Sequence, residues 1–228
     1  MDVAEPSEDI NALAQRHGIR VKYYKTDVAS EESIASSFER AKQDFGRIDN
    51  CITAAGIALE GDFLSHDWDR SRKVLDINVL GSFFCAQHAA SCTRQQNSPG
   101  SIVMIASVAS HCALPGQFVS LYGASKAAVK LLGKTLAVEL APYNIRVNTI
   151  SPGFIETEMS GALAVKKPEL FEVFRKSPPL LRIGQRQDLT MAAAYLLSSS
   201  ASYVTGEDIA VTGGLHAGRI KVSDTVEA

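Results

Sequence analysis

Tyr122 and Lys126 are two side chains of this sequence that could carry out proton chemistry together. They are four residues apart, so a helix would place both on the same face. A free phenol has a pKa of about 10, and an ammonium group within about 4–6 Å favours the phenolate and lowers that pKa. A tyrosine tuned in this way can donate or accept a proton near neutral pH. Taken alone, a Tyr–Lys pair at this spacing is usually an ordinary surface pair. Whether this pair has a catalytic role depends on the elements around it.

Those elements are a strand and a helix that follow one another in the chain. The apolar run 101–107 predicts a strand ending at Ser107, and the segment 120–141 predicts a helix that begins just before Tyr122. At the end of its strand, Ser107 could hydrogen-bond a substrate carbonyl beside the phenol. The chemistry therefore depends on whether the fold brings this strand end to the first turn of the helix.

The whole chain alternates between apolar strands and helical segments. We expect strands at 19–28, 48–55, 101–107, 145–150 and 208–212, and helices at 30–45, 67–95 (bent near Gly81), 120–141 and 186–198. Strands that are apolar throughout indicate a parallel sheet covered on both faces, which is a three-layer, doubly wound α/β fold. Such sheets bind ligands beyond the carboxyl ends of their strands. We expect residues 1–228 to form a single domain.

Composition limits the function further. Hydrophobic residues make up 46% of the 228 residues and charged residues 21%, with a net charge of −2, which indicates a globular chain without affinity for nucleic acid or anionic membranes. The four cysteines lack metal-binding spacing, so we expect reduced thiols and no metal site. No apolar run is long enough to span a membrane and no secretory signal is evident, so we expect a cytoplasmic protein.

The ordered set of motifs resembles the short-chain dehydrogenase/reductase family from about residue 8 to residue 215. The catalytic part of the resemblance is Ser107, then Tyr122 and Lys126, then a strand leading into Ser151–Thr157. Further matching segments are Asp27-Val28, Ala54–Gly56, Asn78–Gly81, Arg146–Asn148, Thr205-Gly206 and Gly213-Gly214. Within the family, the segments around Tyr122 and 141–153 look most like the fungal polyol and ketose members, such as sorbose and mannitol reductases.

The resemblance implies a Rossmann-like fold and an NAD(P)-dependent oxidoreductase that interconverts a carbonyl and a secondary alcohol by hydride transfer. Tyr122 would be the general acid/base, and Lys126 would lower its pKa and hold the nicotinamide ribose. Ser107 would orient the carbonyl, and Asn78 would support a proton-relay water. The implied cofactor contacts are Tyr122 and Lys126 together with Asp27, Val28, Ala54, Ala55, Gly56, Ile155 and Thr157. NADP is the expected cofactor with NAD as the alternative, and a homo-oligomer (tetramer or dimer), formed largely through helices 67–95 and 120–141, is the expected assembly.

Several of these residues have structural alternatives. Asn78 could satisfy backbone groups at a helix bend, Thr157 could cap the following helix, and Asp27 could be a turn residue. The sequence also departs from the family where the usual Asn-Asn-Ala-Gly is Thr53–Gly56, and where the usual C-terminal Asp is Thr212.

The largest departure is at the start of the chain. The family opens with a strand, a Gly-rich turn of TGxxxGxG type, a helix and a second strand, and the sequence contains no such turn. In the usual strand order 3-2-1-4-5-6, segments 19–28 and 48–55 correspond to strands 3 and 4. We therefore expect a domain that lacks the first strand–helix–strand unit, either because the sequence is N-terminally incomplete or because the protein is shortened.

The missing turn keeps two other functions open. A cofactor-free descendant of the family could act as a binding or assembly partner, and it would fold stably without binding nicotinamide. Alternatively, a non-redox lyase or isomerase could use the Tyr122/Lys126 pair as acid and base, and it would turn over without any nicotinamide.

Overall fold

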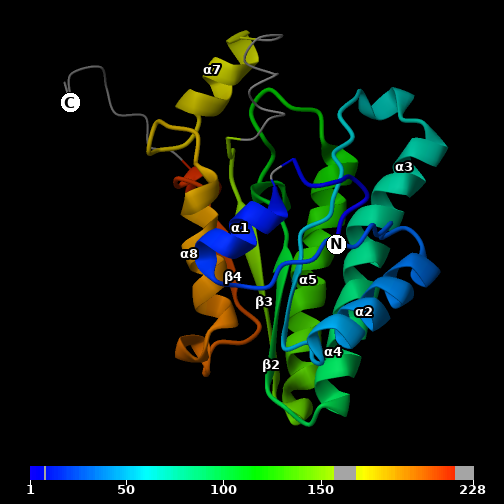
Figure 1. Ribbon diagram of the computed structural model, residues 1–228. Coiled ribbons are helices and arrows are strands. Elements are labelled where there is room, and N and C mark those ends of the chain that lie inside the picture. The colour runs from blue at the N-terminus through cyan, green and yellow to red at the C-terminus, as the bar shows by residue number, and fades with distance from the viewer. Residues whose placement is uncertain (8, 157–167, 219–228) are drawn as a thin grey trace.

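Residues 1–7, 9–156 and 168–218 are described by the computed structural model, and they form three layers (Figure 1). Among the described residues, the strands form one parallel sheet in the order β1 (Asn50–Thr53), β2 (Gly100–Ile105), β3 (Ile145–Pro152) and β4 (Asp208–Val211). The helices α4 (Ser82–Gln95) and α5 (Ser120–Leu140) pack on one face, and α8 (Arg186–Leu197) packs on the other. The predicted Rossmann-like, doubly wound fold is confirmed, whereas the absence of the first strand–helix–strand unit stays a prediction.

The two faces of the sheet bury separate apolar clusters because neighbouring strand residues point to opposite faces. On β2, Met104 joins the cluster that packs against α4 and α5, while the adjacent Val103 packs with Leu196 of α8. Both strand residues are fully buried. A strand with two buried faces must be apolar throughout, which is the pattern seen in the sequence.

The helix predicted at 67–95 forms as a continuous run with a change of winding in the middle. It consists of α3 (Trp68–Leu75), a π-helical turn η2 (Asp76–Gly81) and α4. A Cβ on Gly81 would lie 2.9 Å from Cγ2 of Val28, so only glycine allows this close approach. The π-helical turn also carries Asn78, which is fully buried, and single π-turns of this kind are frequent at functional sites.

The predicted strand at 19–28 is wrong. This segment lies between α1 (Ile10–His17) and α2 (Glu31–Phe45), and its one ladder contact is an isolated bridge between Asp2 and Lys25. Residues 19–28 have the composition of a strand, but a strand also requires a hydrogen-bonding neighbour. In the described residues no strand of the sheet lies beside this segment, so it stays extended without becoming part of the sheet.

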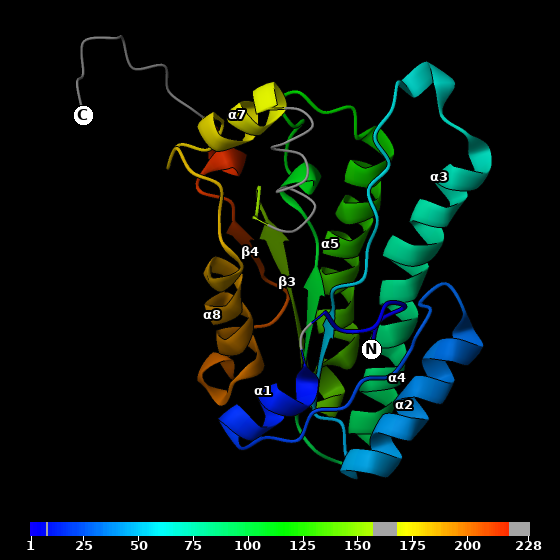
Figure 2. The same cartoon turned by 45° about the horizontal axis from the view of Figure 1, so that its top comes forward.

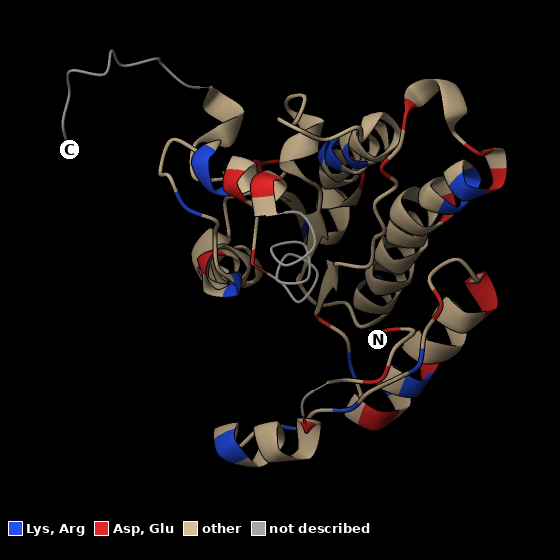
Figure 3. Cartoon of the chain, turned by 90° about the horizontal axis from the view of Figure 1, so that it is seen from above, with Lys and Arg blue, Asp and Glu red and all other residues tan. Residues whose placement is uncertain are grey.

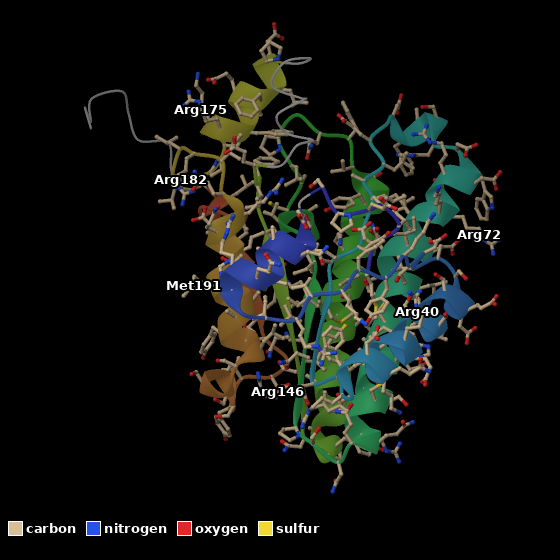
Figure 4. All side chains as sticks on the ribbon, viewed as in Figure 1. Arg40, Arg72, Arg146, Arg175, Arg182 and Met191 are labelled. Atoms are coloured by element: carbon tan, nitrogen blue, oxygen red, sulfur yellow. The ribbon has the colours of Figure 1, made fainter. Side chains whose placement is uncertain are left out.

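Arg146 and Asn148 of β3 hold the lower end of α8, which explains the Arg146–Asn148 motif in structural terms (Figure 4). The Arg146 guanidinium donates to the carbonyl oxygens of Leu196, Ser198 and Val204 at 2.8, 3.1 and 3.1 Å. The Asn148 side chain donates to the Val204 carbonyl at 3.0 Å. The bonds to Leu196 and Ser198 satisfy carbonyl groups that the C-terminal end of α8 leaves unpaired, and the bonds to Val204 hold the segment that follows α8.

The upper end of the molecule holds the carboxyl ends of the strands, and α7 (Pro168–Lys176) lies above them (Figure 2). Figure 3 shows acidic and basic residues interspersed over the helices and loops. None of the described helices is both long enough and apolar enough to cross a membrane. Within the described ranges, no cluster of three or more His, Cys, Asp or Glu side chains could hold a metal ion.

The crossing of α5 over β3 leaves no space for a side chain at Gly133. A Cβ there would lie 2.4 Å from Cγ2 of Thr149. Thr149 is buried and its hydroxyl is bonded to Asp208, so its methyl group is not free to turn away. We expect Gly133→Ala to lower the free energy of unfolding by about 1–3 kcal/mol in urea denaturation, because the overpacking outweighs the better helix propensity of alanine.

A second substitution tests this reason directly. Thr149→Ser removes the obstructing methyl group and keeps the hydroxyl, so Gly133→Ala should cost less in the Thr149→Ser background than in the parent. A Gly133→Ala variant as stable as the parent would show that the crossing can relax.

Candidate active site

Ser107 and Tyr122 meet at the upper end of the sheet. Ser107 follows β2 and begins the short turn η3 (Val108–Ser110), where its Oγ accepts a hydrogen bond from the Ala109 amide at 3.1 Å. Tyr122 lies in the first turn of α5, which packs against η3, and Ser107 is close enough to the phenol to lower its pKa. The strand end and the helix start are therefore brought together, as the sequence required.

Lys126 lies one turn further along α5 and is almost completely buried, with 4% of its surface exposed. Its Nζ is 5.9 Å from the centre of the Tyr122 ring and donates a hydrogen bond to the Ile105 carbonyl at 2.8 Å. Because burial disfavours a charged ammonium, the pKa of Lys126 falls from 10.5 to about 8. A cation is thus held beside the phenol at an energetic cost.

The pKa of Tyr122 is raised, and the expectation that the ammonium would produce a net lowering is wrong for this structure. Burial of the ring raises the pKa, and the hydrogen bond from Ser107 lowers it by a smaller amount. The ammonium of Lys126 donates to the Ile105 carbonyl, and burial remains the largest influence on the phenol. Tyr122 therefore keeps its proton at neutral pH, which is the state needed to donate one.

Asn78 is fully buried and its side chain is occupied by hydrogen bonds. Its Oδ1 accepts from the Ile57 amide at 2.9 Å, and its Nδ2 donates to the Ile57 carbonyl at 3.0 Å and to Ser125 Oγ at 2.9 Å. The side chain thus satisfies backbone groups, which is the structural alternative foreseen for it. A part for Asn78 in a proton relay stays a prediction.

Ser125 belongs to the same network, although no pattern in the sequence singles it out. Its hydroxyl accepts from Asn78 and donates to the Tyr122 carbonyl at 2.7 Å, and the residue is fully buried. Ser125 therefore ties the π-helical turn to the first turn of α5. A serine within a helix is an unremarkable residue in sequence, since its partner Asn78 lies 47 positions away.

Ala54, Ala55 and Gly56 form a floor of small residues next to Lys126, and Gly56 lies directly against it. A Cβ at Gly56 would lie 3.2 Å from Lys126 Nζ and 3.3 Å from Asn78 Oδ1, so a larger residue would crowd both groups. Ala54 and Ala55 are exposed beside it. Small residues therefore border the buried ammonium on this side.

A cavity of 180 Å³ continues from this floor along the carboxyl end of β1. Val28, Ala54 and Ala55 line it, and so does Thr53. The Thr53 hydroxyl is buried without a hydrogen-bond partner, which is unusual for a buried polar atom. Three of the expected cofactor contacts are therefore gathered around a cavity with an unused hydroxyl.

The remaining expected cofactor contacts are not gathered there. The Asp27 carboxylate accepts from the Ala29 amide within its own turn at 2.9 Å, which agrees with the turn-residue alternative. Ile155 pairs with Gly184 and lines a separate cavity of 340 Å³. Thr157 lies outside the described residues.

The nicotinamide end of a dinucleotide fits the residues present. Lys126 offers a buried ammonium beside a floor of small residues, and Tyr122 stands next to it with its proton in place. The fit is therefore to the ribose and nicotinamide of such a cofactor.

Comparison with known proteins agrees with the motif order and the fold. A family model described as enoyl-(acyl carrier protein) reductase matches residues 1–216. The crystal structure of a short-chain type dehydrogenase/reductase from Mycobacterium marinum superimposes with a TM-score of 0.84 at 35% identity, covering 90% of this chain and 79% of that one. The chain belongs to the short-chain dehydrogenase/reductase family. It is therefore an oxidoreductase of the dehydrogenase and reductase type, as the sequence predicted.

Two fungal relatives within this family agree with the predicted resemblance to polyol and ketose members. Sorbose reductase of Schizosaccharomyces pombe is 37% identical over 205 residues, which is 89% of this chain and 78% of that protein. A probable NADP-dependent mannitol dehydrogenase of Yarrowia lipolytica is 33% identical over 217 residues, which is 92% of this chain and 75% of that protein.

Proposed function

We propose that the protein reduces the carbonyl group of a ketose-like substrate to a secondary alcohol with NADPH, and catalyses the reverse oxidation. The observation that carries the proposal is that the turn with Ser107 packs against the start of α5, so that Ser107 lies beside Tyr122, with Lys126 one turn away and Gly56 against its ammonium. These groups can bind an oxygen atom, supply a proton and hold a ribose in one place. The names of the two fungal relatives support a ketose or polyol substrate, and the name of the mannitol dehydrogenase favours NADP(H) over NAD(H).

The bound nicotinamide would supply the hydride, and the chain would supply position and the proton. Lys126 would hold the nicotinamide ribose above the floor of Ala54, Ala55 and Gly56. Ser107 would donate a hydrogen bond to the carbonyl oxygen and orient it toward Tyr122. Tyr122 would then transfer its phenolic proton to that oxygen as negative charge develops there, because its raised pKa keeps it protonated until then.

The test is to mix the purified chain with NADPH or NADH and to follow the loss of the reduced cofactor on adding sorbose or fructose. We expect binding and oxidation of NADPH with a ketose, and weaker activity with NADH. A chain that folds stably but binds neither cofactor would instead be a cofactor-free binding or assembly partner. Turnover of an alcohol or ketose without any nicotinamide would indicate a lyase or isomerase.

We also propose that the protein is a homo-oligomer. Trp68 on α3 and Leu131 and Val138 on α5 are exposed by 80, 63 and 76%, respectively. Large apolar side chains that are this exposed on neighbouring helices suit burial against a second copy. Light scattering at working concentration should give a dimer or tetramer, and a monomer would contradict this. A cytoplasmic location stays a prediction.

A further inference from the structure

We propose that Asp208 is a positioning residue that holds Ser107 beside Tyr122 by contacting both of the elements that carry them. The inference rests on the proposed function, because it concerns the same reactive pair. It is carried by a cluster of polar side chains, namely Asp208, His111 and Lys130, that lies outside the site described above.

The Asp208 carboxylate is fixed in orientation by the neighbouring strand. It lies at the start of β4, and its Oδ1 accepts hydrogen bonds from Thr149 Oγ1 at 2.5 Å and Ser151 Oγ at 2.9 Å, both on β3. Its side chain is 12% exposed. Both carboxylate oxygens thus contact β3, since Ser151 Oγ also lies 3.0 Å from Oδ2, and Oδ2 in addition contacts His111 and Lys130.

His111 is the contact with the turn that carries Ser107. Its Nε2 lies 2.9 Å from Asp208 Oδ2. His111 ends the turn η3 that Ser107 begins, and the turn is closed by bonds from the Ser110 amide to the Ser107 carbonyl and from the His111 amide to the Val108 carbonyl, both 2.9 Å long. A turn this short and this fully bonded moves as a unit, so holding His111 also holds Ser107.

Lys130 is the contact with the helix that carries Tyr122. Its Nζ lies 3.6 Å from Asp208 Oδ2 and 3.1 Å from both ring nitrogens of His111. It stands eight residues after Tyr122 on α5, which is a little over two helical turns. A single carboxylate oxygen therefore contacts both the turn that carries Ser107 and the helix that carries Tyr122.

This arrangement predicts what happens when the carboxylate is removed. Without its charge, Lys130 would lose its ion pair and His111 its charged partner, and the turn and the helix would be held together less firmly. The hydrogen bond from Ser107, which lowers the pKa of Tyr122, would weaken, so that pKa would rise further. The other charged or titratable groups facing the cluster are Lys134 and Glu207, which line the same 410 Å³ cavity, and His216, whose ring meets that of His111 edge-on at 5.6 Å.

The decisive variant is Asp208→Asn, which keeps an oxygen for Thr149 and Ser151 but loses the charge. We expect kcat for ketose reduction to fall by about 10- to 100-fold with an unchanged KM for NADPH, because a small displacement of a reacting group has effects of this size. We also expect the ionisation of Tyr122 to move to higher pH, measured as tyrosinate absorbance of each protein minus that of its Tyr122→Phe version. The matched control is Glu207→Gln, the same change at the adjacent residue, which should alter neither quantity.

Two single-contact variants keep the test decisive if Asp208→Asn does not fold. His111→Phe retains the ring and removes the bond to Asp208, and Lys130→Met retains the stem and removes the ammonium. Each should shift the Tyr122 titration in the same direction by a smaller amount. Variants that lower only the melting temperature, or an equal effect of Glu207→Gln, would overturn the proposal. Because the titration needs no turnover, it decides the role of Asp208 even if the chain reduces no ketose.

Discussion

Tyr122→Phe is expected to lower kcat for carbonyl reduction by about 100- to 10,000-fold, which is the usual contribution of a general acid. The change removes one oxygen atom and with it both the proton donor and the bond to Ser107. The ring itself remains, so packing at the start of α5 is preserved. Steady-state kinetics with NADPH and a ketose would measure the loss.

The affinity for NADPH provides the internal control for this variant. Lys126 and the small residues at 54–56 are unchanged, so the dissociation constant should stay at its parental value. Tyr203→Phe is the matched control, since Tyr203 is fully exposed on the surface and its hydroxyl should be dispensable. A Tyr122→Phe protein with nearly full kcat would remove the basis of the proposed mechanism.

Lys126→Met is expected to abolish activity and at the same time to stabilise the fold. At pH 7 the lysine is charged in the folded and the unfolded state, but burial disfavours the charge only in the folded state. The drop in its pKa from 10.5 to about 8 corresponds to a cost of about 3 kcal/mol. Methionine avoids that cost but loses the bond to the Ile105 carbonyl, worth about 1 kcal/mol, so we expect a net gain of about 1–3 kcal/mol.

The stabilisation expected for Lys126→Met depends on pH. Because the folded-state pKa is the lower one, the parent suffers the full cost below about pH 8 and is relieved of it as the pH rises toward 10.5. The stability difference between Lys126→Met and the parent, measured by denaturant unfolding, should therefore shrink between pH 7 and pH 10. Lys134→Met, at an exposed position on the same helix, should show neither the gain nor the trend. A Lys126→Met protein that is less stable than the parent at pH 7 would contradict this account.

The layers of the fold could be predicted because they depend on local patterns. The apolar runs that became β2 and β3 and the helical spacing of α5 are visible in short windows of sequence. The helix that follows a parallel strand begins at the carboxyl edge of the sheet. Ser107, at the end of β2, was therefore expected near Tyr122, at the start of α5. The segment 19–28 shows the limit of this reasoning, because its composition is that of a strand but its pairing depends on parts of the chain far from it.

The electrostatics of the site could not be predicted in the same way. Spacing places Lys126 on the face of Tyr122, but it does not reveal that the ammonium donates to Ile105 or that the phenol is buried, and these decide the direction of the pKa. The hydrogen-bond partners of Ser125 and Asp208 could not be predicted from the sequence either. Asp208 contacts a histidine 97 positions earlier, and no local pattern records such a contact.

The π-helical turn between α3 and α4 has a consequence for insertions and deletions. Each residue in an α-helix advances the side-chain direction by about 100°, and the wider turn at 76–81 accommodates one extra residue within a continuous helix. The two halves of the helix are thereby set out of phase. Deleting a single residue from 76–81 would restore regular winding and swing Asn78 away from Ile57 and Ser125, so this stretch should tolerate substitutions in its exposed positions far better than a change in its length.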